Sequence, residues 1–292
     1  MFSAPEINER LERSHFRLSS ANSINWGRLA PQIVYYFTGY EEMVLAGKVE
    51  RGQPINICVP TGNFGNILAA SYAIRCGLPV SRLICASNIN KVLTDFIHTG
   101  IYDRRRDFHK TESPSMDILI SSNLERLLFE LAGRKPESVR DWMNKLAAQG
   151  HYRIPKESLE KLQSLFYGGF ANPLETSRAI KEAFEGHGYV MDPHSAVGYN
   201  VLEKYREETG DTKPTLLAST ASPFKFNRAV LEALGLETAD KDEFSLLMEL
   251  SALISRPVPV KLAELNSLPE IHTEVCEKEE MAKVLYKFLK IN

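Results

Sequence analysis

Short apolar runs alternate with amphipathic stretches along most of this chain. Three β-leaning runs predict buried strands at 55–59, 82–87 and 215–220, and shorter runs predict strands at 116–120 and 189–192. Helical spacing of apolar residues follows these runs, as in 123–132, where four leucines form one stripe. Strands that alternate with helices indicate an α/β fold with a doubly wound, mostly parallel sheet.

The turn after the first predicted strand is the centre of this pattern. The strand 55–59 runs through Pro60 and Thr61 into Gly-Asn-Phe-Gly-Asn at 62–66, and a predicted helix, 67–76, follows. Such a turn points backbone N–H groups and the positive end of a helix at one place, which suits a phosphate. We expect Asn66 to cap the helix. The spacing matches neither the nucleotide P-loop nor G-x-G-x-x-G, and a tight turn also needs glycine for packing alone.

Polar side chains cluster where the predicted strands end. The clusters are 61–66, 87–90, 192–195 and 219–222. Ligands bind at the carboxyl ends of parallel strands, so four clusters at one edge favour a binding site, although turn chemistry explains each cluster separately. Another polar stretch, 19–25, has more Ser and Asn than one helix cap needs, which favours a loop that faces a ligand.

Composition is ordinary for a soluble globular protein. The 292 residues are 43% hydrophobic and 25% charged, with a formal net charge of −2, so we expect neither nucleic acid nor a membrane as a partner. No apolar run approaches the roughly 20 residues that span a bilayer, and no signal peptide is evident. Four widely spaced cysteines predict a reduced, cytoplasmic protein, and seven histidines without ligand spacing predict no metal site.

Several motifs in one order carry a resemblance to a known family. They are 20–25 (Ser-Ala-Asn-Ser-Ile-Asn), 60–66, 86–90, 94–96, 113–126, 192–196 (Asp-Pro-His-Ser-Ala) and 219–221 (Ser-Thr-Ala). Together they resemble threonine synthase of the bacterial and fungal type, from about Leu18 to the C-terminus. The resemblance implies a pyridoxal-phosphate enzyme of the tryptophan-synthase-β kind, which is fold type II of these enzymes.

The resemblance implies cofactor-binding roles for the central turn and for the end of the last strand. Main-chain N–H groups would hold the phosphate of pyridoxal 5′-phosphate at Gly62, Asn63, Phe64, Gly65 and Asn66. This agrees with the physical reading of the turn. Thr220, together with Ser219, would hydrogen-bond the pyridine nitrogen, and a hydroxyl there leaves that nitrogen largely unprotonated.

The same resemblance suggests where the substrate binds. Contacts to O-phosphohomoserine, a phosphorylated small molecule, are expected from Ser20, Asn22, Ser23, Asn25 and Arg28. One departure concerns Ser222, because the family usually has His after Ser-Thr-Ala.

The largest departure is the catalytic lysine. The family forms its Schiff base through a lysine in a Phe-Lys-Asp context upstream of the Ser-Ala-Asn-Ser-Ile-Asn motif, and no lysine here stands in a matching context. We therefore assign no catalytic residue. Lys225 is nearest the proposed site but lies just past the ring-nitrogen residue, so we expect it to be solvated or to face a phosphate. The whole chain, 1–292, is expected to be one large α/β domain with a helical insertion at about 133–169 and without the N-terminal small domain.

Three hypotheses follow for function. The first is the C-terminal part of a threonine synthase, which converts O-phosphohomoserine and water to threonine and phosphate and has no turnover as an isolated chain. The second is a threonine-synthase-like phospho-lyase that releases a ketoacid. The third is a non-catalytic scaffold that binds a phosphorylated metabolite or a partner, with self-association through surface left exposed by the missing elements.

Overall fold

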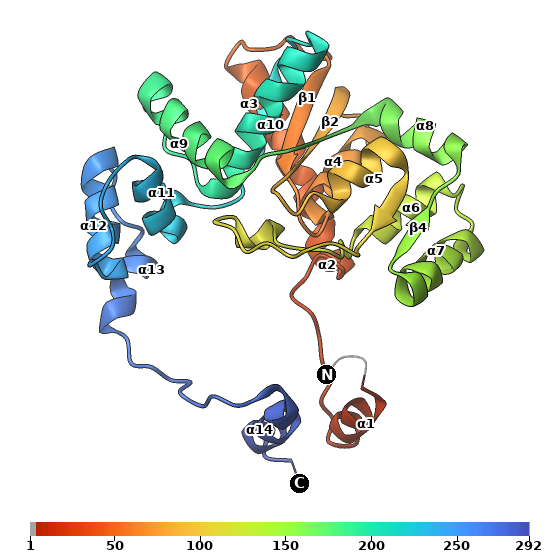
Figure 1. Ribbon diagram of the computed structural model, residues 1–292, viewed down its shortest axis with the longest axis vertical. Helices are drawn as coiled ribbons and strands as arrows, with labels where there is room; N and C mark the ends of the chain where they lie inside the picture. The colour runs from red at the N-terminus through yellow and green to blue at the C-terminus, as the bar shows by residue number, and fades with distance from the viewer. Residues whose placement is uncertain (1–3, 292) are drawn as a thin grey trace.

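A four-stranded parallel sheet forms the centre of the computed structural model, which describes residues 4–291 (Figure 1). The strands lie in the order β5 (Phe166–Phe170), β2 (Val80–Ser87), β1 (Ile55–Pro60) and β6 (Thr215–Leu217). β1 pairs in parallel with β2 on one side and with β6 on the other, and β2 pairs in parallel with β5. All four strands therefore end at the same edge of the sheet.

Helices cover both faces of the sheet. Along β1, Ile57 and Val59 join the larger apolar core, which also takes in residues of α3 (Gln32–Leu45), α4 (Gly65–Arg75) and α5 (Val92–Thr99). Cys58, between them, joins a second core under α10 (Pro193–Thr209). Since successive side chains of a strand point to opposite faces, this alternation buries β1 on both sides.

The remaining elements surround this centre. Before the sheet come α1 (Pro5–Arg13) and α2 (Trp26–Leu29). Between β2 and β5 the chain forms β3 (Ile101–Asp103), η1 (Pro114–Met116), α6 (Leu124–Leu131), α7 (Pro136–Gln149), β4 (His151–Arg153) and α8 (Lys156–Leu165). After β5 come α9 (Pro173–His187), η2 (Pro223–Phe226), α11 (Asn227–Ala233), α12 (Glu243–Ile254), α13 (Val260–Ala263), η3 (Glu264–Ser267), η4 (Lys278–Glu280) and α14 (Met281–Leu289).

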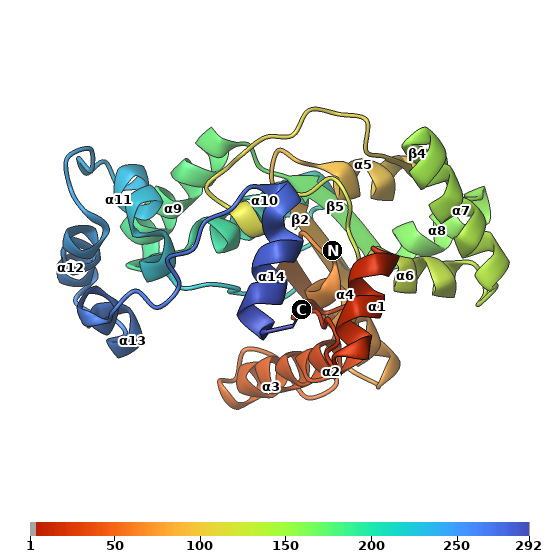
Figure 2. The ribbon, with the colours of Figure 1, turned by 90° about the horizontal axis from the view of Figure 1, so that it is seen from below.

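A separate apolar cluster joins α9, α11 and α12 beside the main body, as Figure 1 shows. Figure 1 shows α1 and α14 below the main body, and Figure 2 shows them side by side in front of it. The guanidinium carbon of Arg10 lies 4.2 Å from the centre of the Tyr286 ring, so a cation–π contact joins these two helices. In the described part of the chain, no helix is both long and apolar enough to cross a membrane.

The structure corrects two of the predicted strands. Residues 116–120 contain the end of the η1 turn and no strand, and residues 189–192 form an extended lead into α10 without a sheet partner. The apolar residues in both runs are buried by packing instead: Met116 lies in the core under α10, and Val190 lies in the cluster of α9, α11 and α12. Burial without strand pairing gives the same short apolar pattern.

The structure adds one core strand that the pattern missed. β5 includes Gly168 and Gly169, and glycine weakens a strand prediction. Both are needed for packing, because a β-carbon would stand 3.1 Å from the Thr94 Cα at Gly168 and 2.6 Å from Val201 Cγ1 at Gly169. The stretch 133–169, expected to be a helical insertion, thus holds α7, β4, α8 and most of β5.

Candidate functional site

A pocket of about 280 Å³ opens at the carboxyl edge of the sheet, where β1 and β6 end. It is lined by Ser23, Gln32, Pro60, Thr61, Gly62, Asn63, Phe64, Gly65, Asn66, Ser115, Met116, His194, Thr220, Ala221 and Lys225. The whole turn 62–66 and Thr220, which the sequence predicts to hold two ends of one cofactor, therefore face the same space.

Hydrogen bonds from Ser121 and Asn123 fix two carbonyl groups of the turn. The Ser121 hydroxyl donates to the Gly62 carbonyl at 2.8 Å, and Asn123 donates to the Asn63 carbonyl through its backbone N–H at 3.1 Å and its side-chain amide at 2.9 Å. In a planar trans peptide, the N–H points opposite to the carbonyl of the same unit. The N–H groups of Asn63 and Phe64 thus point away from Ser121 and Asn123.

These N–H groups form an unfilled set of donors. Between residues 4 and 291, no carbonyl or side chain accepts a hydrogen bond from any backbone N–H of residues 62–67. The first turn of α4 adds the positive end of the helix dipole at the same place. The first N–H groups of a helix have no partner within the helix, and donors grouped in this way can bind an anion. We call residues 62–66 the anion cradle.

Phe64 makes the sharp entry into α4. Its backbone is left-handed, with φ of 64°, and its ring is buried and stacks on Phe166 with centroids 5.9 Å apart. The expectation that Asn66 caps this helix is wrong, because α4 begins at Gly65 and the Asn66 side chain instead accepts from the Tyr36 hydroxyl. Burial, and to a lesser extent nearby Cys58, raises the pKa of Tyr36, so its phenol stays a donor.

Two neighbouring segments press against the glycines of the cradle. A β-carbon on Gly62 would overlap the Ser115 carbonyl oxygen and stand 3.2 Å from the Met116 Cα. A β-carbon on Gly65 would stand 2.8 Å from the Ser23 Cβ. Both positions have ordinary negative φ, so glycine is required there by close approach of the chain rather than by a left-handed backbone.

The opposite wall carries a free hydroxyl and a free ammonium group. Thr220 is exposed, and in the described chain its hydroxyl has no hydrogen-bond partner. Lys225 is the one lysine or arginine among the lining residues. Its Nζ lies 5.5 Å from the Phe226 ring centre and makes no ion pair with any carboxylate of residues 4–291. The pocket thus has one mobile positive charge and no acidic side chain.

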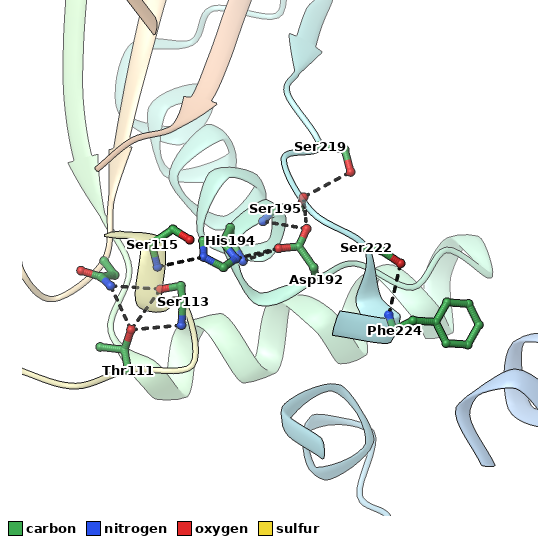
Figure 3. Close-up of polar contacts among 10 residues, drawn as sticks. Thr111, Ser113, Ser115, Asp192, His194, Ser195, Ser219, Ser222 and Phe224 are labelled. Atoms are coloured by element: carbon green, nitrogen blue, oxygen red, sulfur yellow. Dashed lines mark hydrogen bonds and ion pairs between the residues drawn. The ribbon is translucent and has the colours of Figure 1, made fainter. Parts of the chain in front are cut away.

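A chain of polar contacts, buried at Asp192, His194 and Ser195, connects the two walls (Figure 3). The Ser115 backbone N–H donates to His194 Nε2 at 3.3 Å, and His194 Nδ1 lies 2.9 Å from Asp192 Oδ1. Asp192 caps α10 by accepting from the backbone N–H groups of His194 and Ser195, and it also accepts from the Ser195 hydroxyl. The Ser195 hydroxyl lies 3.4 Å from that of Ser219, next to Thr220.

The loop expected to bind substrate is largely occupied by its own turns. The Ser20, Asn22 and Asn25 side chains accept from backbone N–H groups two residues further on. Ser23 alone of the five expected residues lines the pocket, where its hydroxyl accepts from Gln32. Arg28 is exposed and does not line the pocket.

The predicted meeting of four polar clusters needs one correction. Clusters 61–66, 192–195 and 219–222 each contribute to the pocket, but cluster 87–90 does not. Asn88 and Ile89 instead line a smaller cavity of about 90 Å³ beside α9 and α11. Ser113 lines that cavity and Ser115 lines the pocket, so the segment around η1 separates the two spaces.

Sequence reasoning gave no role to three residues of the pocket and expected a fourth, Lys225, to be solvated or to face a phosphate. Gln32, Ser115, His194 and Lys225 all line the pocket. His194 stands within a motif already placed at this edge. Ser115 lies within the motif 113–126, but nothing in the local pattern gives it or Gln32 a role, because their contacts join distant parts of the chain.

Comparison with known proteins gives a consistent result. A family model described as "Threonine synthase, C-terminal" matches residues 195–284. Human "Threonine synthase-like 1" is 41% identical over 272 residues, which cover 92% of this chain and 35% of that protein. Threonine synthase of Saccharomyces cerevisiae is 33% identical over 286 residues, covering 93% of this chain and 55% of that protein.

Solved structures agree. Pyridoxal-phosphate-bound threonine synthase from Brucella melitensis superposes with a TM-score of 0.80 and 36% identity, covering 99% of this chain and 55% of that one. The yeast enzyme gives a TM-score of 0.78 and 32% identity, covering 92% and 54%. The chain thus spans about a third to about half of the length of these relatives. The expected α/β fold of type II pyridoxal-phosphate enzymes is confirmed.

Proposed function

We propose that this chain, which is similar to the threonine synthases and threonine synthase-like proteins and matches the C-terminal threonine synthase model, forms the cofactor-binding part of a pyridoxal-phosphate-dependent lyase. The substrate we propose is O-phosphohomoserine, and the products are threonine and phosphate. The single observation that supports the proposal is the anion cradle, whose unfilled N–H groups share one pocket with the free Thr220 hydroxyl.

The donors of the pocket fit the cofactor. Residues 62–66 would bind its phosphate through backbone N–H groups, which suit a doubly charged anion at a helix N-terminus. Thr220 would bind its ring nitrogen through the hydroxyl. When bound, the cofactor withdraws electrons from the substrate carbon next to the amino group and so eases proton removal there. The chain's own residues bind the phosphate, orient the ring, and add the positive charge of Lys225.

The remaining substrate assignments rest on position. Ser23 faces the cradle through Gly65 and is the member of the 20–28 stretch that we propose contacts the substrate. Ser20, Asn22 and Asn25 support it by shaping the loop. Lys225 replaces Arg28 as the residue that we propose attracts the substrate phosphate, because it lines the pocket.

The test is equilibrium binding by the chain itself, followed by ultraviolet–visible spectroscopy. We expect reversible binding of pyridoxal 5′-phosphate, competition by inorganic phosphate, and at least roughly tenfold weaker binding of pyridoxal, which lacks the phosphate. Equal affinity for pyridoxal and its phosphate would refute the cradle. Because the chain has no lysine in the family's Phe-Lys-Asp context, borohydride should trap no stoichiometric lysine adduct.

Turnover gives the second arm of the test. We expect the chain with cofactor and O-phosphohomoserine to release no phosphate, and release at a rate above buffer would contradict this. Supplying the preceding half of a related threonine synthase tests whether the parts complement each other. Threonine as the product supports the proposed reaction, whereas ketobutyrate indicates the phospho-lyase instead.

A further inference from the structure

The contacts around His194 define a role for each nitrogen of its imidazole ring. The ring is buried, with 3% of the residue exposed, and packs against Phe226 with centroids 4.9 Å apart. Nε2 receives the Ser115 backbone N–H, so Nε2 must carry a lone pair. Nδ1 faces the Asp192 carboxylate, which only accepts, so Nδ1 carries the proton.

This tautomer fixes one wall of the pocket. The hydrogen bond to Nε2 holds the backbone of Ser115, and the carbonyl of the same residue packs directly on Gly62 of the anion cradle. Loss of the acceptor at Nε2 would leave the Ser115 N–H without a partner and free the η1 segment to move away from Gly62. A protonated or rotated imidazole cannot make this bond.

The other end of the same polar chain reaches the Thr220 wall. Asp192 accepts from the Ser195 hydroxyl, which in turn lies 3.4 Å from the Ser219 hydroxyl. The distance between cradle and Thr220 is therefore set through Asp192, which is fixed by its position at the N-terminus of α10. Figure 3 shows the chain running from Ser115 through His194 and Asp192 to Ser219.

We propose that His194, oriented by Asp192, is a positioning residue that sets the width of the pocket between the anion cradle and Thr220. It acts through Ser115 on one side and through Ser195 and Ser219 on the other. This inference rests on the proposed function, since it assigns a role relative to the ligand of the cradle.

The first measurement needs no ligand. Nitrogen-15 NMR of the histidine-labelled chain should show one imidazole with an unprotonated Nε2 and a protonated Nδ1, with both signals shifted in Asp192→Asn. A His194 imidazole with the proton on Nε2 would overturn the inference, whether or not the chain binds a cofactor. The signal is assigned by its loss in His194→Gln.

Binding separates positioning from folding. His194→Leu removes the acceptor, and we expect roughly tenfold weaker binding of pyridoxal 5′-phosphate, the loss typical of a buried donor left unpaired. His194→Gln offers an amide oxygen to Ser115 and should restore affinity to within about threefold of the parent. The inference fails if both variants fold but His194→Leu and His194→Gln bind pyridoxal 5′-phosphate with the same affinity, so that glutamine restores nothing.

The chain offers a matched control for Asp192. Asp242 caps α12 with the same backbone angles and also accepts from the backbone N–H and hydroxyl of the serine three residues on. Asp242→Asn therefore changes a cap of the same kind away from the pocket. We expect Asp192→Asn to weaken cofactor binding about threefold to tenfold and Asp242→Asn to leave it unchanged. Equal effects on binding would reduce Asp192 to a helix cap and overturn its positioning role.

Failure of the proposed function and failure of the positioning role give different results. If the parent chain binds no phosphate-bearing ligand but shows the stated His194 tautomer, the proposed function fails and the local geometry stands. If the parent binds the cofactor and the His194 and Asp192 variants bind it as tightly as the parent does, the cradle's role in binding is supported and the positioning role is refuted.

Discussion

The carbonyl oxygen of Ser115 lies against Gly62 so closely that a β-carbon at Gly62 would overlap it. Gly62 is the first residue of the anion cradle, and Ser115 belongs to η1, more than fifty positions later in the chain. The contact explains why the cradle begins with glycine. It also couples the cradle to His194, which holds the backbone of Ser115 from its other side.

Substituting Gly62 should therefore damage both fold and site. In Gly62→Ala the methyl group must displace the backbone of Ser115, and we expect a loss of about 1–3 kcal/mol in the free energy of unfolding. Binding of pyridoxal 5′-phosphate should fall roughly tenfold or more, because the N–H groups of the cradle shift. Urea denaturation and spectroscopic titration measure the two effects.

Gly186→Ala is the control for that substitution. Gly186 lies in α9 with no atom within 4 Å of an added β-carbon, so alanine should be neutral or stabilising by up to about 1 kcal/mol. If the Gly62→Ala chain is as stable as the parent, the η1 segment moves to accommodate the methyl group at little cost in free energy.

Lys225→Met should weaken phosphate binding without changing stability. The ammonium group lines the pocket and has no ion-pair partner within residues 4–291, so its charge is free to attract an anion. We expect the affinity for inorganic phosphate to fall about threefold to tenfold at low ionic strength, with a smaller difference at high salt. Lys283→Met, an exposed change on α14, serves as control. A salt-independent loss would argue against a charge effect.

Thr220→Val distinguishes the ring end of the pocket from the phosphate end. Valine keeps the shape of threonine but removes the hydroxyl, so pyridoxal 5′-phosphate should bind about threefold to tenfold more weakly while inorganic phosphate binds unchanged. Isothermal titration with both ligands measures this. Thr212→Val, at an exposed threonine elsewhere, should alter neither affinity. Equal weakening for both ligands would mean that Thr220 shapes the cradle and does not contact a ring.

Asp211 should contribute stability that disappears in acid. Its burial alone would raise the pKa, but hydrogen bonds from the Lys213 backbone, Asn56, Tyr205 and the Lys213 ammonium outweigh burial and hold the pKa of Asp211 well below its usual range. A pKa that is lower in the folded state gives stability above the unfolded value, about 3.9, and this stability is lost as the pH falls through the folded value.

The corresponding experiment compares Asp211→Asn with the parent across pH. Asparagine should lower the free energy of unfolding at pH near 7, where the carboxylate holds β1 and α10 together. The difference in this free energy between variant and parent should become smaller as the pH drops well below about 4. Asp240→Asn, at an exposed position, controls for the change in net charge. If the difference in unfolding free energy between the parent and Asp211→Asn stays constant in acid, the Asp211 carboxylate does not contribute the pH-dependent stability.

Local patterns predicted the parts of the site that are local in the chain. The strand, glycine turn and helix at 55–75 follow from one apolar run and its turn residues, and the structure places them as expected. The self-occupied loop was also within reach of sequence reasoning, because Ser20, Asn22 and Asn25 bond to N–H groups only two residues away.

Long-range contacts account for what the sequence did not predict. The partner of His194 is 79 positions earlier in the chain, and no periodicity reports such a pair. β5 escaped notice because its two glycines serve contacts with Thr94 and Val201, which only the folded sheet brings near. Asn66 has a typical capping side chain, but the buried Tyr36 hydroxyl binds it instead.

The pairing of β1 with β6 sets the order in which the protein can assemble during synthesis. Asn56 pairs with Thr215, so the residues between these two positions must be synthesised before that ladder can form. Such distant pairing slows folding, because a long segment must be closed before any contact rewards it. The residues of the anion cradle are therefore synthesised well before Thr220, so the two sides of the pocket can come together only late in synthesis.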